Sequence, residues 1–227
     1  MKVVRSGTWT NPVFDEELGR EPGIDLSVLS VTGPEAEGWA LLEKAHVYHL
    51  MAAKDDLPRR WFVTANLLER CPNLLCVSSS GAGYDTIDVD ACNKAGVAVV
   101  NQAGGNATAV AEQTLGLMIA VSRRMVEQDR RLRNEQGFTR EDVMGREISG
   151  RVLGLVGMGH VGTRVAEFAR VFGITVLATD PYLNDQEISK RGAEPVPMDE
   201  LLERSDIVSL HCPYTDETKG MIDADAL

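Results

Sequence analysis

The sequence predicts an α/β fold of two domains, each built around a parallel β-sheet. Continuously apolar segments of strand length alternate with segments of helical periodicity, which is typical of strands covered on both faces. A glycine-rich turn joins an apolar segment to a helical one at residues 157–162. The segment Asn101–Asn106, N-Q-A-G-G-N, interrupts the alternation and separates two series of such units. With 227 residues, the chain is long enough to give each domain its own core.

The first series supplies the elements of the first predicted domain. Two helices are expected, one at Glu35–Ala45 and one from Pro58 to about Arg70, because apolar residues recur there at helical spacing. Five strands are expected in the same part of the chain: Lys2–Arg5, Leu26–Leu29, His46–Leu50, Leu74–Val77 and Val97–Val100. Repeated units of this kind imply a parallel sheet with helices on its faces.

A single long helix is expected next, from about Ala107 to Asn134. Asn106 is suited to cap its N-terminus. The middle of this helix, Leu115–Val121, is apolar on almost every side, so we expect it to be buried between two bodies of protein. The tail, Arg123–Glu135, carries charges of both signs and is expected to be a solvated face rather than an anion site.

The second series contains the strongest functional signal, G-M-G-H-V-G at residues 157–162, which follows the apolar strand Val152–Val156. Gly157 permits a tight turn, Gly159 lets the backbone approach a diphosphate, and Gly162 lets the following helix pack close to the strand. The free N–H groups at the N-terminus of that helix would bind the diphosphate. The pattern therefore predicts a dinucleotide site.

Asp180 ends the next apolar strand, Thr175–Thr179. A carboxylate in this position can accept hydrogen bonds from the hydroxyls of a ribose, and it would repel a 2′-phosphate. The sequence thus favours NAD over NADP as the cofactor.

A third apolar strand lies within Asp206–Pro213 and ends at the same edge of the sheet as the glycine turn. A loop with the pattern T-x-x-T, Thr215–Thr218, follows it at the place where a cofactor would lie. The sequence places no acidic partner near His211. A structural histidine, hydrogen-bonded to the backbone, is therefore its favoured interpretation.

The segment Ser78–Asp85, S-S-S-G-A-G-Y-D, directly follows a predicted buried strand of the first domain. Small residues at the carboxyl end of a parallel strand leave backbone N–H groups free to bind a carboxylate. A tight turn in which Asp85 or Thr86 starts the next element explains the same residues equally well. The residues alone leave both interpretations open.

Composition excludes several classes of protein. A net charge of −11 argues against binding to nucleic acids or anionic membranes. We find neither an apolar run of membrane-spanning length nor an N-terminal signal segment. The four cysteines lack the spacing of metal ligands, so we expect no metal site, reduced thiols and a cytoplasmic protein.

Five segments, in this order, resemble the family of D-isomer-specific 2-hydroxyacid dehydrogenases, and the resemblance covers nearly all of the chain from about Leu74. They are G-A-G-Y-D-T-I-D (81–88), N-Q-A-G-G-N-A-T-A-V-A-E (101–112), G-M-G-H-V-G (157–162), T-D-P-Y (179–182) and H-C-P-Y-T-D-E-T-K-G-M-I (211–222). The resemblance implies a flavodoxin-like substrate-binding domain at residues 1–101 and a Rossmann NAD-binding domain at residues 102–227. It also implies reversible hydride transfer between NAD(H) and a small 2-hydroxy or 2-keto acid.

The resemblance also assigns roles to individual positions. The backbone of Gly81, Ala82 and Gly83 resembles the loop that binds the substrate carboxylate. Asn101–Asn106 resembles a hinge, and the helix after it resembles part of a dimerisation region, which implies a homodimer. In the family's cofactor site, His160 and Val161 correspond to residues over the diphosphate, and Cys212, Pro213 and Thr218 to the walls around adenosine. The implied cofactor residues are Thr114, Gly157, Gly159, His160, Val161, Gly162, Asp180, Cys212, Pro213 and Thr218.

The sequence departs from the family pattern in its catalytic residues. The family's arginine, glutamate and acid/base histidine come after the H-x-P-x-T-x-E-T segment, and no residue here matches any of the three. We therefore expect a truncated form with an incomplete second domain, an uncovered apolar sheet edge and little turnover of its own. The alternatives are a non-catalytic, NAD(H)-responsive binding or regulatory protein and the product of a decayed gene.

Overall fold

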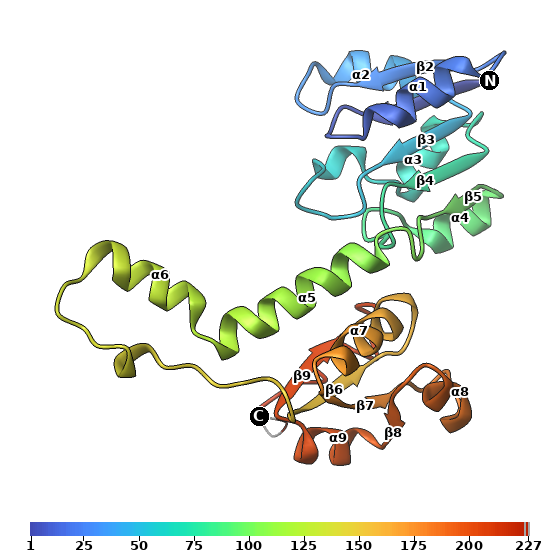
Figure 1. The fold of residues 1–227 in the computed structure, drawn as a ribbon. Coiled ribbons are helices and arrows are strands. Elements are labelled where there is room, and N and C mark those ends of the chain that lie inside the picture. The colour runs from blue at the N-terminus through green and yellow to red at the C-terminus, as the bar shows by residue number, and fades with distance from the viewer. Residues whose placement is uncertain (225, 227) are drawn as a thin grey trace. The chain divides into compact units, whose positions relative to one another are not determined.

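The computed structural model of the chain describes residues 1–224 and residue 226. The chain divides into two compact units, Met1–Asn106 (unit 1) and Ala107–Leu227 (unit 2) (Figure 1). The end of the second predicted domain, Leu227, lies outside the described residues. Both units contain a parallel sheet, so the predicted α/β class is confirmed.

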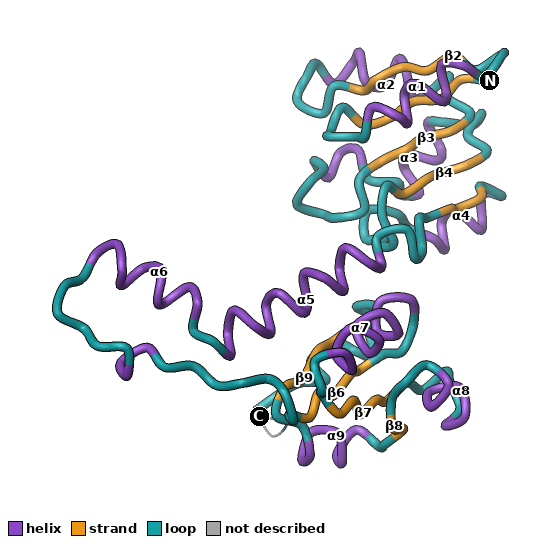
Figure 2. Tube along the Cα trace, in the orientation of Figure 1, coloured by secondary structure: helices purple, strands orange, loops and turns teal. Residues whose placement is uncertain are grey.

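The sheet of unit 1 has five parallel strands in the order β2-β1-β3-β4-β5 (Figure 2). The strands are β1 (Lys2–Ser6), β2 (Asp25–Leu29), β3 (Val47–Leu50), β4 (Cys76–Ser79) and β5 (Ala98–Val100). The helices are α1 (Pro12–Arg20), α2 (Glu35–Leu42), α3 (Ala65–Arg70) and α4 (Val89–Ala95). β4 begins two residues later than predicted, and Leu75, expected in a buried strand, is 61% exposed.

The core of unit 1 is centred on Trp61, which is fully buried. The indole N–H of Trp61 donates to the carbonyl oxygen of Val31 at 3.2 Å. The Tyr48 hydroxyl donates to the backbone carbonyl oxygen of Trp61 at 3.2 Å. The indole N–H of Trp61 and the hydroxyl of Tyr48, which are the polar groups of these two core side chains, are therefore both hydrogen-bonded. Gly38 of α2 lies against the indole, where a Cβ atom would overlap it.

The single helix predicted from Pro58 to Arg70 is wrong. A short 3₁₀ turn, Arg59–Trp61, is followed by extended backbone, and α3 begins only at Ala65. The cause is a tertiary contact: Val63 pairs with Ile87 in a parallel bridge, which requires extended backbone. The Thr64 side chain then caps α3.

The sheet of unit 2 has four parallel strands in the order β8-β7-β6-β9. They are β6 (Val152–Val156), β7 (Thr175–Thr179), β8 (Glu194–Pro195) and β9 (Ile207–Leu210). α7 (His160–Val171) follows β6, and α8 (Asp185–Lys190) and α9 (Met198–Arg204) precede β8 and β9. Among the described residues β9 is an edge strand, and its Val208 and Leu210 are 38% and 49% exposed, as the sequence led us to expect.

The long helix predicted at 107–134 is two helices, α5 (Ala107–Ser122) and α6 (Met125–Asn134). Arg124 between them has a left-handed backbone with φ of 51°. The break has a tertiary cause, since the N–H of Arg146 donates to the carbonyl oxygen of Ser122 at 2.7 Å. A Cβ on Gly145 would lie 2.5 Å from the Cα of Arg123, so this returning loop crosses the end of α5 closely.

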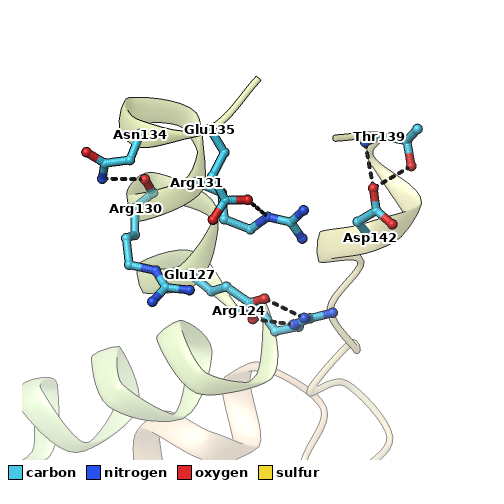
Figure 3. A network of polar contacts seen from close by, with 8 residues as sticks. All are labelled: Arg124, Glu127, Arg130, Arg131, Asn134, Glu135, Thr139 and Asp142. Carbon is cyan, nitrogen blue, oxygen red and sulfur yellow. Dashed lines mark hydrogen bonds and ion pairs between the residues drawn. The ribbon is translucent and has the colours of Figure 1, made fainter. Parts of the chain in front are cut away.

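α6 and the segment after it carry a network of charged side chains (Figure 3). Arg124 donates to both carboxylate oxygens of Glu127, at 2.7 and 2.8 Å, and Arg131 pairs with Glu135 at 2.7 Å. The Asp142 carboxylate accepts from the Thr139 N–H at 2.7 Å, which holds the pKa of Asp142 below its usual range. α6 buries none of its residues in the single chain, and its charged side chains form the exposed face that the sequence predicted.

Within the single chain, the segment Leu115–Val121 is not buried as predicted between two bodies of protein. Met118 is 6% exposed, whereas Leu117 and Val121 are 54% and 76% exposed. Within unit 2 the helix packs along α7 with one side only. Neither helix, nor any other in the described part of the chain, combines the length and hydropathy needed to cross a bilayer.

Candidate functional site

Two of the three glycines of the 157–162 turn are required by close packing. Gly157 has φ of 98°, and a Cβ there would lie 2.9 Å from the backbone of His211 and Cys212. A Cβ on Gly162 would overlap the carbonyl oxygen of Gly157, so α7 passes directly over the turn. Gly159 differs, because a Cβ there would meet no atom within 4 Å. The turn therefore presents open space at its middle glycine.

The N-terminus of α7 faces this open space without a cap. Gly159 is the N-cap residue, and no side chain among the described residues bonds to the first turn. The N–H groups of His160, Val161 and Gly162 precede the first intrahelical hydrogen bond, which Thr163 donates to Gly159 at 3.1 Å. Uncapped N–H groups at the positive end of a helix form a site for an anion such as a diphosphate.

Asp180 lies at the glycine turn. Because β7 pairs with β6, the carboxylate reaches the adjacent loop, where it accepts the Met158 N–H at 2.9 Å. Its other oxygen accepts the Tyr182 N–H at 3.0 Å. A carboxylate has about four acceptor positions, so about two remain for hydroxyl groups. The structure thus brings together the two sequence features on which the dinucleotide prediction depends.

The loop after β9 contacts the loop that follows Asp180. The Tyr182 hydroxyl donates to Glu217 at 2.9 Å, and this carboxylate raises the pKa of the phenol. Thr218 donates to the carbonyl oxygen of Pro213 at 2.7 Å and accepts the Thr215 N–H at 2.8 Å, which fixes the shape of the loop. The residues expected around adenosine, Cys212, Pro213 and Thr218, belong to this loop. The contact between Tyr182 and Glu217 was not foreseen from the sequence.

Arg191 is a second feature that sequence reasoning missed. Its guanidinium donates to the carbonyl oxygen of Met158 inside the glycine turn. Together with Arg164 it lines a pocket of about 360 Å³ that also includes Gly159 and His160. Glu167 lines the pocket too and pairs with Arg164 at 2.6 Å, so Arg191 is the guanidinium that brings positive charge to the glycine turn. No motif marks Arg191, which follows α8 and reaches the turn only through the fold.

The side chains of His211 and Thr114 each form a hydrogen bond to a residue nearby in the sequence. The His211 ring bonds to the Ser209 hydroxyl at 3.0 Å rather than to backbone, while burial lowers its pKa. The Thr114 hydroxyl donates to the carbonyl oxygen of Val110 at 2.8 Å. Thr114 also lines an apolar groove of about 260 Å³ between α5 and β9. In the described part of the chain, no hydrogen bond joins Thr114 to the glycine turn.

In unit 1, the loop Gly81–Gly83 follows β4. The alternative in which Asp85 or Thr86 starts the next helix is wrong, because Asp88 caps α4 by accepting the Ala91 N–H at 2.9 Å. The Thr86 hydroxyl instead donates to the carbonyl oxygen of Met51 at 2.6 Å. The segment between β4 and α4 is therefore a loop at the carboxyl edge of the sheet.

The cysteines and the acidic residues form no further site in the described part of the chain. All four cysteines are free thiols, and burial raises the pKa of Cys71 to about 11, which leaves that thiol unreactive near neutral pH. Among described residues, no three His, Cys, Asp or Glu side chains are placed to hold a metal ion.

Comparison with known proteins places these features in context. Residues 115–227 match the family described as D-isomer specific 2-hydroxyacid dehydrogenase, NAD binding domain. The chain is 41% identical to D-3-phosphoglycerate dehydrogenase of Mycobacterium tuberculosis over 165 residues, which are 73% of this chain and 31% of the relative. It is 38% identical to glyoxylate reductase of Korarchaeum cryptofilum over 168 residues, 73% of this chain and 51% of the relative.

A solved structure shows the same likeness. D-lactate dehydrogenase from Aquifex aeolicus, complexed with NAD and lactic acid, matches 99% of this chain and 64% of its own, with a TM-score of 0.81 and 28% identity. The chain thus spans between 31% and 51% of the length of the two curated relatives.

Proposed function

Because the chain belongs to the family of D-isomer-specific 2-hydroxyacid dehydrogenases, we propose that unit 2 binds NAD(H) and unit 1 binds a 2-hydroxy or 2-keto acid. The corresponding activity is that of an NAD-dependent oxidoreductase. The observation that carries the proposal is the Asp180 carboxylate, which is hydrogen-bonded to the N–H of Met158 in the glycine turn.

The residues at the turn fit a dinucleotide. The free N–H groups of His160, Val161 and Gly162 bind the diphosphate, and the open space at Gly159 admits it. Asp180 accepts hydrogen bonds from the ribose hydroxyls and repels a phosphorylated ribose, which selects NAD over NADP. Bound nicotinamide would donate or accept the hydride, and the protein would position the cofactor and exclude competing reactions.

The substrate end of the proposal depends on the loop Gly81–Gly83, whose backbone N–H groups bind the carboxylate of the acid. Reduction of a 2-keto acid also needs a cation that polarises the carbonyl and an acid that gives it a proton. No residue of this sequence matches the arginine, glutamate and histidine that serve these purposes in the family. We therefore assign no catalytic residue within this sequence.

Two finer assignments complete the proposal. We assign the exposed apolar residues of α5 and α6 to a homodimer interface with a second copy of the chain: Leu117, Val121, Met125, Val126 and Leu132. Light scattering should give twice the mass of the chain, and Val126→Glu should reduce the measured mass to that of one copy.

The compartment is the second assignment. Four free thiols fit the reducing cytoplasm as the compartment.

The relatives described above are dehydrogenases and reductases, so we do not propose the non-catalytic, regulatory alternative. The decisive experiment is calorimetric titration of the full chain with NADH and with NADPH. We expect NADH to bind about tenfold or more tightly than NADPH, since one charge-assisted contact is replaced by repulsion. Equal affinity for the two cofactors, or no binding of either, would overturn the proposal.

A further inference from the structure

The loop Gly81–Gly83 is held from one side through its carbonyl oxygens. Its first carbonyl oxygen accepts the N–H of Gln102 at 3.0 Å, and its second accepts the side-chain amide of Asn101 at 2.8 Å. The third accepts the hydroxyl of Ser79 at 2.5 Å. Three successive peptide groups are therefore fixed by donors from the ends of β4 and β5.

Peptide geometry determines where the opposite ends of these groups point. In a planar trans peptide, the N–H of one residue points away from the C=O of the residue before it. The N–H groups of Ala82, Gly83 and Tyr84 consequently point away from the ends of β4 and β5. None of the three donates to an acceptor in the described part of the chain.

From this geometry we propose that Ser79 and Asn101 are positioning residues, which aim three consecutive backbone N–H groups at the substrate carboxylate. The inference rests on the proposed function of unit 1. The donors of the site are then set by two side chains that do not touch the substrate. Fixed donors bind an anion more tightly than mobile ones because they lose less freedom on binding.

Burial of Ser79 supports a specific role for its hydroxyl. The residue is fully buried at the end of β4, and its hydroxyl donates to the carbonyl oxygen of Gly83. A buried hydroxyl without a partner is costly, so the side chain and the loop hold each other in place. Asn101 is exposed by contrast. It directly follows β5, and its side-chain amide donates to the carbonyl oxygen of Ala82.

The neighbouring serine supplies a matched control. The Ser80 hydroxyl contacts the sulfur of Met51 at 3.1 Å and leaves the three carbonyl oxygens of the loop untouched. Ser80→Ala and Ser79→Ala therefore remove the same atom from adjacent residues with different consequences for the loop. Ser79→Thr keeps the hydroxyl and should rescue binding.

The test is titration of the full, isotope-labelled chain with oxamate, followed through backbone amide resonances, with a parallel calorimetric titration with NAD⁺. We expect oxamate to shift the resonances of residues 82–84. Ser79→Ala and Asn101→Ala should each weaken oxamate binding about tenfold, because a charge-assisted hydrogen bond is lost or misaligned. The Ser80→Ala and Ser79→Thr proteins should bind oxamate like the parent, and all variants should bind NAD⁺ equally.

Unchanged oxamate affinity in Ser79→Ala and Asn101→Ala would overturn the inference, as would oxamate shifts confined to other residues. If Ser79→Ala does not fold, the exposed Asn101 carries the test through its own variant. Failure of the parent chain to bind NAD⁺ would instead contradict the proposed function. The titration with oxamate therefore tests the inference, and the titration with NAD⁺ tests the proposed function.

Discussion

Replacement of Asp180 by asparagine tests whether the carboxylate holds the glycine turn together. The carboxylate offers one oxygen to the Met158 N–H and the other to the Tyr182 N–H. Asparagine has one oxygen for these two donors, and its NH₂ group must face the remaining N–H. A hydrogen bond to a charged acceptor contributes about 1.5–3 kcal/mol, and we take about 1.5 kcal/mol because Asp180 is half-buried.

The expected result is a fall in the melting temperature of unit 2 by about 6 °C, at about 4 °C for each kcal/mol in a unit of this size. Scanning calorimetry and far-UV circular dichroism measure it. Asp185→Asn is the matched control, since it removes the same charge from an exposed residue in the first turn of α8. NAD⁺ affinity should fall about tenfold in the first variant and stay unchanged in the control.

Equal melting temperatures for the two variants would refute the reasoning, because the carboxylate would then contribute nothing to the turn beyond its charge. A loss of NAD⁺ affinity without a loss of stability would separate the two roles, and would leave the ribose contact standing alone.

Two further predictions concern packing and pH. Gly162→Ala should lower the free energy of unfolding by about 1–3 kcal/mol in urea titrations, because its Cβ would overlap the backbone oxygen of Gly157. Gly116→Ala, in open space on α5, should raise that free energy by about 0.5–1 kcal/mol, and equal effects would contradict this prediction. Burial, then nearby positive charge, lowers the pKa of His49, so the folded state favours the neutral ring. Its contribution to stability is complete above about pH 6.5, the unfolded pKa, and is lost as pH falls from there through the folded pKa. Tryptophan fluorescence should show a smaller loss of stability between pH 7 and pH 5 in His49→Phe, since all tryptophans lie in unit 1 and His211 is common to both proteins.

Local signals made the sheet of each unit predictable. The apolar strands Val152–Val156 and Thr175–Thr179 have the predicted bounds. α1 and α4 were missed although their caps are visible in the sequence. α1 has Asn11 followed by proline, but it is short, and its one apolar pair at helical spacing, Phe14 and Leu18, is only half-buried. α4 is short and lies between Asp88 and the left-handed Gly96.

The features that the sequence could not supply depend on contacts between distant segments. Nothing in the residues near Arg124 marks a helix end, because the break is made by a loop that returns more than 20 residues later, at Arg146. The sequence likewise predicts a helix that includes Trp61, and the pairing of the nearby Val63 with Ile87, which ends this helix, is not visible in the local residues.

The candidate site divides in the same way. The glycines and Asp180 follow from spacing along two adjacent strands. The hydrogen bond from Tyr182 to Glu217 requires two loops to meet, and that from Arg191 to Met158 requires α8 to return to the turn. Neither meeting is encoded in a short motif.

The double attachment of Asp180 limits how cofactor preference could be redesigned. A substitution that admits a phosphorylated ribose must remove the carboxylate, and the Met158 and Tyr182 amides then lose their acceptor. An engineer would first have to install another oxygen beneath the turn. The same constraint applies during evolution. A substitution of Asp180 alone should destabilise the fold whether or not it changes the preference between NAD and NADP.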